Sequence, residues 1–242
     1  KTFRPRGDEN NEAFLTMLDH YLGRSSLRLS PSVNVLDIGC YTMPYIDALS
    51  TYLERAGLPL SEARSVSITG VEMPSSEFRD ILPLYFPGID ERTLSLSKGN
   101  TSLNIIEDTL KSYADLQHIS NLSGHSKFEL VTLFAPGPNE RLAAASTYEV
   151  LGGSGKTPVT DALKTGSYIT LLLEAIPRVL SKNGVLLIGT VEGGAPHEYV
   201  LKSVQQSGLT LEVNEKNRFR KHLTEFLNPL EKIIVARKGG RK

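Results

Sequence analysis

The sequence predicts a three-layer α/β domain with a mainly parallel sheet of about seven strands that ends in an antiparallel C-terminal hairpin. Short, nearly continuous apolar runs alternate along the chain with segments whose apolar residues recur at helical spacing. Continuous apolar runs are typical of strands buried on both faces, and strands separated by helices imply right-handed crossovers between parallel neighbours. The length of 242 residues fits one large domain better than two small ones.

The expected elements follow from these two patterns. Helical spacing predicts helices over residues 14–22, 46–56, 78–85, 103–118 and 169–180. Apolar runs predict strands over residues 33–38, 66–73, 93–96, 128–134 and 185–191, the last entered directly from a turn at Asn183-Gly184. Residues 209–213 and 232–236 are two further strands with no convincing crossover helix between them, which indicates that they pair antiparallel.

Composition excludes several classes of protein. Lys plus Arg number 27 and Asp plus Glu number 27, so the net charge of zero argues against binding to nucleic acid through an overall positive field. The single cysteine, Cys40, cannot form an intramolecular disulfide, which favours a reducing compartment. No stretch approaches the ~18 apolar residues of a membrane span. We therefore expect a cytoplasmic protein with no membrane contact.

The end of the first strand is the first place to look for a site, because ligands of such sheets bind beyond the carboxyl ends of the strands. Asp37 places a charge near the end of an apolar strand, where it costs free energy unless a ligand or an ordered partner satisfies it. Gly39 follows at the turn and would let a ligand approach the backbone.

The run Val-Leu-Asp-Ile-Gly-Cys at residues 35–40 resembles the first motif of the class I S-adenosylmethionine-dependent methyltransferases. The resemblance implies a Rossmann-like fold with S-adenosylmethionine as cofactor, and in that family the acidic residue and the glycine-rich turn hold the methionine end of the cofactor. It thus implies a role in cofactor binding for Asp37, Gly39, Cys40 and Tyr41. We expect residues 1–29 to form an N-terminal helical segment that caps the site and residues 30–242 to form the cofactor-binding domain.

The same resemblance extends to later strands. Glu72 ends the second strand and, by resemblance, accepts hydrogen bonds from both ribose hydroxyls, with Met73 against the adenine. A carboxylate suits this task because its two oxygens can accept from adjacent hydroxyls. Resemblance also implies that Asn100, after the third strand, reaches the adenine amine and that Phe134 lines the pocket.

The turn after the first strand departs from the family. Tyr41 occupies the place of a second glycine, and Pro44 makes the turn stiffer because its ring fixes φ. Either the cofactor sits slightly differently, with a tyrosine near its carboxylate, or binding has been lost.

The leading function is transfer of a methyl group to an O, N or C nucleophile. The sulfonium of the cofactor is already a good leaving group, so the main task of the protein is alignment of the acceptor. The neutral net charge favours a small-molecule acceptor, with RNA or protein as acceptor still open. Residues after the fourth and fifth strands are candidates for acceptor contacts, namely Asn139, Glu140, Glu192 and His197, and the last two are candidate general bases. The alternative is a non-catalytic protein of this fold that acts as a binding or regulatory partner.

Other motifs in the sequence are weaker indications of function. Gly152–Thr157 resembles a phosphate-binding loop, but Val150 stands where that pattern needs glycine, so we expect a loop over the mouth of the site and keep a nucleotide triphosphatase as an alternative. The five histidines show no metal-ligand spacing, so no metal site is predicted. A basic cluster, Arg218, Arg220, Lys221 and His222, is explained equally by contact with phosphates or an acidic partner and by solvated surface charge.

Overall fold

The computed structural model describes residues 8–25, 27–39, 45–59, 61–72, 76–108, 113–134, 167–191, 197–220 and 230–239. Within these residues the strands are β1 (Ser32–Ile38), β2 (Ser65–Glu72), β3 (Ser95–Lys98), β4 (Thr101–Glu107), β5 (Phe128–Phe134), β6 (Leu180–Val191), β7 (Leu209–Lys216) and β8 (Leu230–Lys238). The helices are α1 (Asp8–Leu22), α2 (Ile46–Arg55), α3 (Ser76–Tyr85), α4 (Tyr113–Ser123), α7 (Ser167–Val179) and α8 (His197–Gln206).

The strands form one eight-stranded sheet in the order β3-β4-β2-β1-β5-β6-β8-β7. The five central strands, from β4 to β6, pair parallel to one another. At the C-terminal side β8 enters between β6 and β7 and pairs antiparallel with both. The predicted parallel sheet with an antiparallel C-terminal pair is therefore confirmed.

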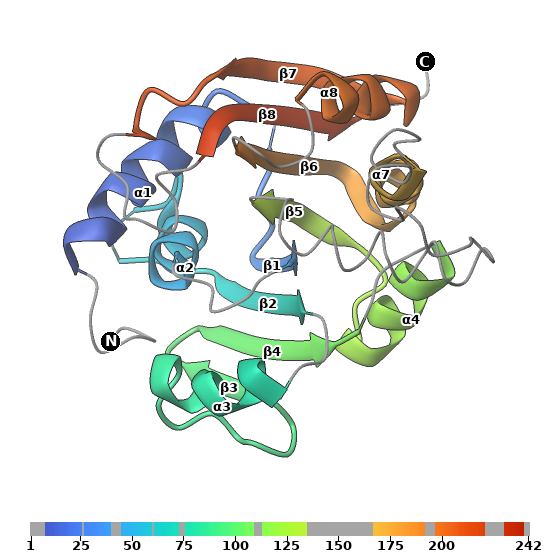
Figure 1. Cartoon of the computed structure of the whole chain (residues 1–242). Helices are drawn as coiled ribbons and strands as arrows, with labels where there is room; N and C mark the ends of the chain where they lie inside the picture. The colour runs from blue at the N-terminus through green and yellow to red at the C-terminus, as the bar shows by residue number, and fades with distance from the viewer. Residues whose placement is uncertain are drawn as a thin grey trace.

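Helices cover both faces of the sheet, with α1 and α2 on one side and α4 and α7 on the other (Figure 1). Alternate residues of β1 serve the two layers, because successive side chains of a strand point to opposite faces. Val33 and Val35 join the core beneath α1, α2 and α3, whereas Leu36 and Ile38 join the core beneath α4, α7 and α8. Each of these four side chains is at most 5% exposed, so the central strands are apolar on both faces as their sequences predict.

The N-terminal helix belongs to the main core. Phe14, Met17, Leu18 and Tyr21 of α1 are fully buried, and α1 packs beside α2. At about 25 cal/mol per Å² of apolar surface, burial of four such side chains stabilises this docking by several kcal/mol. None of the helices within the described residues is long and apolar enough to cross a membrane.

The prediction for residues 93–118 was wrong in its order of elements. The predicted third strand is an antiparallel edge strand, β3, and the first part of the predicted helix is instead β4, which lies parallel to β2. Leu103 and Ile106 are buried in the sheet, so the three-residue spacing between them imitated a helix by coincidence. Gly99 adopts a φ of 61° in the two-residue turn that joins β3 to β4. Gly-Asn between two short runs is a hairpin signal that could have given the correct order.

Two further features differ from the prediction, one helix and one strand boundary. The helix α8 precedes β7 and was not predicted. The strand β6 starts at Leu180 rather than at residue 185, and its register against β5 shifts between Phe128 and Leu130. Between those two positions β6 advances from Leu180 to Val185, so the residues of the predicted Asn183-Gly184 turn lie in an irregular part of the strand.

Candidate active site at the carboxyl edge of the sheet

The carboxyl ends of β1, β2, β4, β5 and β6 lie at one edge of the sheet, because these strands are parallel. Glu72 is opposite Glu107 in the register of β2 and β4, and Phe134 is opposite Gly189 in that of β5 and β6. Asp37 lies one residue before the end of β1, between Gly70 and Thr132. The fold thus places the carboxylates of three neighbouring strands along the same edge.

Asp37 is fully buried and both of its carboxylate oxygens accept hydrogen bonds. The Tyr45 hydroxyl donates to Oδ2 at 2.6 Å, and the Thr132 hydroxyl donates to Oδ1. Burial raises the pKa of Asp37 from 3.8 to about 7, the two hydroxyl donors oppose that rise, and the charge of Glu72 adds to it. Asp37 therefore changes charge close to neutral pH.

Tyr45 fixes this carboxylate from a cluster of aromatic rings. Its ring stacks on Phe14 of α1 with centroids 5.1 Å apart and meets Phe134 of β5 edge-on at 4.9 Å. Phe134 in turn lies against Gly189, where a Cβ would stand 2.9 Å from Cδ1 of Phe134. The helix α1, the start of α2 and the end of β5 thus meet beside Asp37.

Gly39 provides the open backbone that the sequence predicts at this turn. Its N–H donates to the carbonyl of Val71 at 2.9 Å, and its φ of 70° lies in the left-handed region that favours glycine. No described residue comes within 4 Å of the position that a Cβ would take. The backbone after β1 is held to β2, and the described residues leave space beside Gly39.

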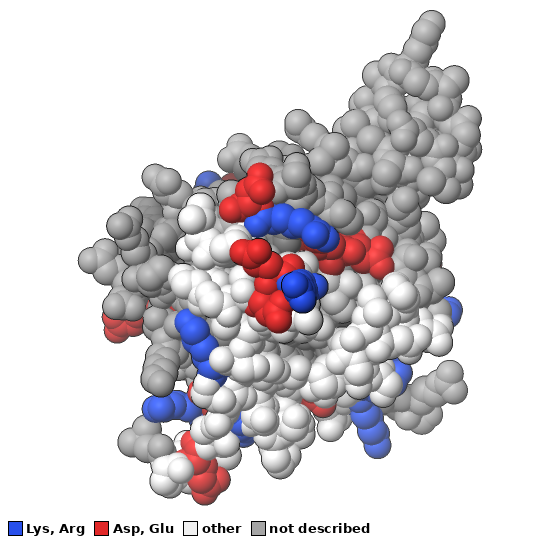
Figure 2. All heavy atoms as spheres, turned by 90° about the horizontal axis from the view of Figure 1, so that it is seen from below, with Lys and Arg blue, Asp and Glu red and all other residues white. Residues whose placement is uncertain are grey.

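Glu72 and Glu107 end adjacent strands and are largely buried, with 5% exposure for residue Glu72 and 7% for the Glu107 side chain. Arg79 of α3 donates hydrogen bonds to Glu107 through its Nε, which lies 2.9 and 2.8 Å from the two carboxylate oxygens. The N–H of Asp108 donates to the Glu72 carbonyl at 2.9 Å. Figure 2, seen from the side of β3 and α3, shows acidic side chains close to a few basic ones near the middle of that side of the molecule. Arg79 neutralises one carboxylate, which lowers the cost of placing these acids side by side.

The structure does not bring Asn100 to this edge. Its carbonyl accepts from the N–H of Val66 at 2.9 Å, so Asn100 lies at the amino-terminal start of β2 and β4, across the sheet from Glu72. The prediction depended on the wrong order of strands in this region. The end of β4 instead brings Glu107 and Asp108 beside Glu72, and the alternation of Leu103 and Ile105 was the signal that could have found them.

Tyr45 and Thr132 were not predicted as partners of Asp37. Thr132 lies 95 residues away in sequence, so no local spacing links it to Asp37. A polar residue within the otherwise apolar end of β5 was the only indication. Cys40, Tyr41, Met73 and Glu192 lie outside the described residues, as do Asn139, Glu140 and the Gly152–Thr157 loop.

His197 starts α8 beyond the end of β6, and both of its ring nitrogens have partners. Nδ1 lies 3.3 Å from the Thr190 hydroxyl, and Nε2 lies 2.8 Å from Oδ1 of Asn214. An amide oxygen only accepts, so Nε2 carries the proton and Nδ1 accepts from Thr190. Burial lowers the pKa of His197, and the bond to Asn214 opposes that shift. The described contacts hold this ring in place, and a role as general base stays a prediction.

Metal ligands are not gathered at this edge within the described part of the chain. No group of three or more His, Cys, Asp or Glu side chains there has an arrangement that could hold a metal ion.

Neither known protein families nor curated relatives match this sequence. Solved structures do match its fold. A Listeria monocytogenes protein assigned to the class I S-adenosylmethionine-dependent methyltransferases superposes with a TM-score of 0.53 at 14% identity, over 95% of this chain and 60% of that one. The cyclopropane synthase MmaA2 of Mycobacterium tuberculosis superposes with a TM-score of 0.50 at 14% identity, over 92% of this chain and 70% of that one.

The chain has the class I methyltransferase fold. In this fold the edge that holds Asp37, Gly39 and Glu72 is the one where the parallel strands end, which is where ligands of open α/β sheets bind.

Proposed function

We propose that this protein is an S-adenosylmethionine-dependent methyltransferase that moves a methyl group to an O, N or C nucleophile of a small molecule. The observation that carries the proposal is the pair of buried carboxylates, Asp37 and Glu72, at the ends of adjacent parallel strands of a class I methyltransferase fold. Charges in such positions cost free energy unless a ligand or a hydrogen-bond donor satisfies them.

The hydrogen-bonding groups at this edge fit the cofactor. Glu72 offers two carboxylate oxygens, which match the two adjacent hydroxyls of a ribose. The described residues leave space beside Gly39, and Asp37 lies two residues before it, where its ionised form would suit the cationic methionine end. Glu107 and Asp108, at the end of the next strand, offer acceptors for an exocyclic amine of the adenine. These residues would hold S-adenosylmethionine across β1, β2 and β4.

The protein itself needs to supply little acid–base chemistry. S-adenosylmethionine supplies an activated methyl group on a sulfonium, so what remains for the chain is to orient the acceptor and exclude water. The half of the carboxyl edge formed by β5, β6 and β7 is left for that acceptor. His197, at the start of α8 beyond β6, and Glu192, which follows β6 in the sequence, are proposed as bases for acceptors that must lose a proton.

A calorimetric titration tests the proposal directly. The purified protein is titrated with S-adenosylmethionine and S-adenosylhomocysteine, with ATP as the control ligand. We expect micromolar affinity for the first two and none for ATP. Binding of ATP alone would contradict the proposal and favour a nucleotide triphosphatase.

Two Glu→Gln variants test where the ligand binds. Glu72→Gln is expected to weaken S-adenosylhomocysteine binding about 10- to 100-fold, because hydrogen bonds to a charged group are lost. Glu129→Gln is the matched control, since Glu129 accepts from the Asn34 N–H near the start of β5, at the opposite edge. Equal affinities of the two variants would show that the ligand does not bind at Glu72.

A second candidate is a non-catalytic protein of the same fold. The hydroxyls of Tyr45 and Thr132 already satisfy both oxygens of Asp37 from within the chain, so this carboxylate is stable without a ligand. The absence of binding of both cofactor forms would favour this candidate.

A further inference from the structure

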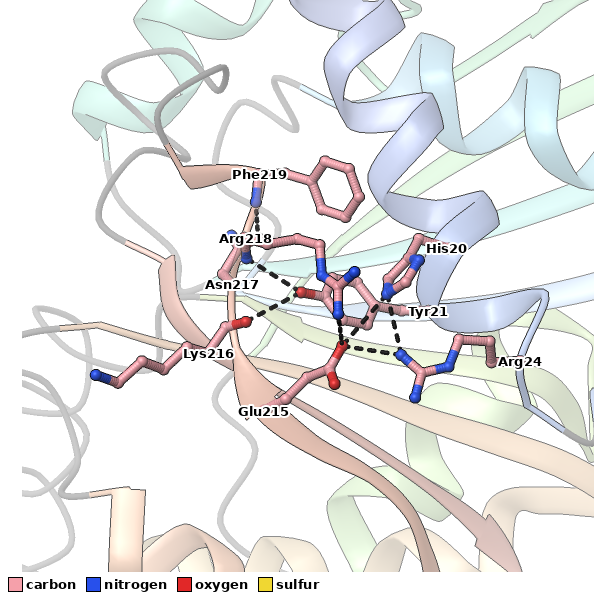
Figure 3. A network of polar contacts seen from close by, with 8 residues as sticks. All are labelled: His20, Tyr21, Arg24, Glu215, Lys216, Asn217, Arg218 and Phe219. Atoms are coloured by element: carbon pink, nitrogen blue, oxygen red, sulfur yellow. Dashed lines mark hydrogen bonds and ion pairs between the residues drawn. The ribbon is translucent and has the colours of Figure 1, made fainter.

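A second group of charged side chains lies at the same carboxyl edge, at the end of β7 (Figure 3). Lys216 ends β7 opposite Lys232 of β8, and Lys232 is in turn opposite Thr190 near the end of β6. The end of β7 therefore lies level with the ends of the parallel strands. In the sheet order it is three strand spacings from β5, about 14 Å at ~4.8 Å per spacing.

Three nitrogen-bearing side chains converge on one carboxylate oxygen here. Oε1 of Glu215 lies 2.9 Å from Nη1 of Arg24, 3.3 Å from Nε2 of His20 and 3.5 Å from Nη2 of Arg218. Figure 3 shows the two guanidinium groups approaching this carboxylate from different sides, one from the turn after α1 and one from the segment after β7. Two permanent positive charges thus face a single negative one, which leaves a surplus of positive charge.

The backbone around Arg218 is held firmly. Its N–H donates to the Tyr21 hydroxyl at 3.4 Å, and that hydroxyl donates to the carbonyl of Lys216 at 3.3 Å. Asn217, 6% exposed, accepts from the Phe219 N–H and donates to the carbonyl of Leu230, both at 3.0 Å. The aromatic rings of Tyr21 and Phe219 meet edge-on, with centroids 5.9 Å apart. Little backbone entropy therefore remains to be lost around Arg218 when a ligand binds.

The guanidinium groups keep donors for a further partner. In the contacts among described residues each uses a single terminal nitrogen, Nη1 of Arg24 and Nη2 of Arg218. The two side chains are 49% and 58% exposed, so their remaining N–H groups reach solvent. A planar guanidinium matches the paired oxygens of phosphate and carboxylate, and such bidentate contacts are among the stronger hydrogen bonds.

We propose that Arg24 and Arg218, held together by Glu215, bind an anionic group of the methyl acceptor, a phosphate or a carboxylate. The proposal rests on the proposed function for the identity of the ligand as acceptor. The distance between this group and Phe134 also predicts the shape of the acceptor. The acceptor is elongated, with its anionic end about three strand spacings, roughly 14 Å, from the residues beside Asp37.

The size of the group favours a small molecule over a nucleic acid. Among the described residues it contains two arginines tied to one carboxylate, and the side chain of Lys216 points away from them (Figure 3). An RNA-binding surface neutralises several successive phosphates, and the net charge of zero provides no field for that.

The test titrates the full chain with inorganic pyrophosphate and, in a second arm, with succinate, by calorimetry at low salt. Arg24→Gln and Arg218→Gln each remove one guanidinium. Arg237→Gln is the matched control, because Arg237 pairs with Glu212 at 3.0 Å and lies opposite Val185, at the other edge of the sheet. Affinity for S-adenosylhomocysteine is measured for every variant as a check on folding and on the cofactor site.

We expect the wild-type chain to bind one of the two anions and each arginine variant to bind it at least about fivefold more weakly. The control variant should keep the wild-type affinity, and S-adenosylhomocysteine should bind all four proteins equally. The arm that responds distinguishes phosphate from carboxylate.

Three results would overturn the proposal. The first is an affinity for the anion that is the same in the wild-type chain and in the arginine variants. The second is competition between the anion and S-adenosylhomocysteine. The third is binding of a single-stranded RNA that is far tighter than that of either anion and depends steeply on salt. If the anion binds through both arginines but neither cofactor form binds, the anion site stands and the proposed function fails.

Discussion

The two halves of the carboxyl edge are built with opposite chemistry. Over β4, β2 and β1 the strands end in acids that are almost completely buried, and Asp37 and Glu107 are satisfied by hydroxyls or by Arg79. Over β7 the charged side chains are half exposed, and arginines outnumber the single carboxylate that holds them. The core beneath both halves is continuous, since Phe134, Leu187 and Val235 belong to one cluster.

This difference indicates how one sheet can serve two ligands. Buried carboxylates are costly and specific, which suits a cofactor that carries hydroxyls and positive charge. Exposed arginines cost little to keep and select only for an anionic group, which suits a second ligand that must enter and leave. The following predictions test this contrast, from the largest expected effect to the smallest.

Asp37 should make the stability of the folded chain fall as the pH rises. Its pKa is about 7 in the folded chain and near 3.8 when unfolded, so between these values the folded state binds one more proton than the unfolded state. Stability is therefore highest below about pH 4 with respect to this group and decreases up to pH 7, by up to about 4 kcal/mol. Urea denaturation of Asp37→Asn should lack this component, and parallel curves for the two proteins would contradict the assignment.

Gly189 lies at the boundary between the halves, and Gly189→Ala should disturb both. The new Cβ would stand 2.8 Å from Leu230 and 2.9 Å from Phe134, so these side chains must move. We expect a loss of about 1–3 kcal/mol in unfolding free energy. Gly208→Ala is the comparison, because Gly208 has open space around it but a φ of 80°. Unchanged stability of Gly189→Ala would show that Phe134 and Leu230 do not pack against β6 as described.

Tyr45→Phe should affect only the acidic half. It keeps the ring between Phe14 and Phe134 and removes the hydroxyl that donates to Asp37, at a cost of about 1–2 kcal/mol. Because that hydroxyl lowers the pKa of Asp37, its loss should move the pH-dependent decrease in stability to higher pH. A denaturation series between pH 5 and 9 measures both effects, and an unshifted pH dependence would separate Tyr45 from Asp37.

Glu215→Gln should affect only the basic half, and weakly. It removes the carboxylate that joins α1 to β7, but the groups are partly exposed, so the loss should be at most about 1 kcal/mol. The loss should shrink in high salt, where exposed ion pairs are screened. Glu212→Gln, which breaks the pair with Arg237, serves as the comparison. A salt-independent loss of several kcal/mol would mean that this network is part of the core.

Local patterns were sufficient for the central strands β1, β2 and β5, whose apolar runs are nearly continuous. The strands around Asp37, Glu72 and Phe134 were found because continuous apolar runs have few alternative structures, and their carboxyl ends had to meet once the strands were parallel. The order of β3 and β4 was missed because Leu103 and Ile106 of β4 fall at helical spacing as well. That error placed Asn100 at the wrong edge. The strand before it, β3, is antiparallel to the central strands, so β3 ends at the edge opposite the one where those strands end.

By itself, the sequence determined the class of fold, the two buried acids and the open glycine between them, because these depend on residues near one another along the chain. Only the tertiary structure decided what those acids and the distant arginines touch. Thr132 reaches Asp37 across 95 residues and Glu215 reaches His20 across 195, so no periodicity or spacing records either contact. Such contacts depend on strand order and on the docking of α1, which are settled by the burial of the whole core rather than by any single segment.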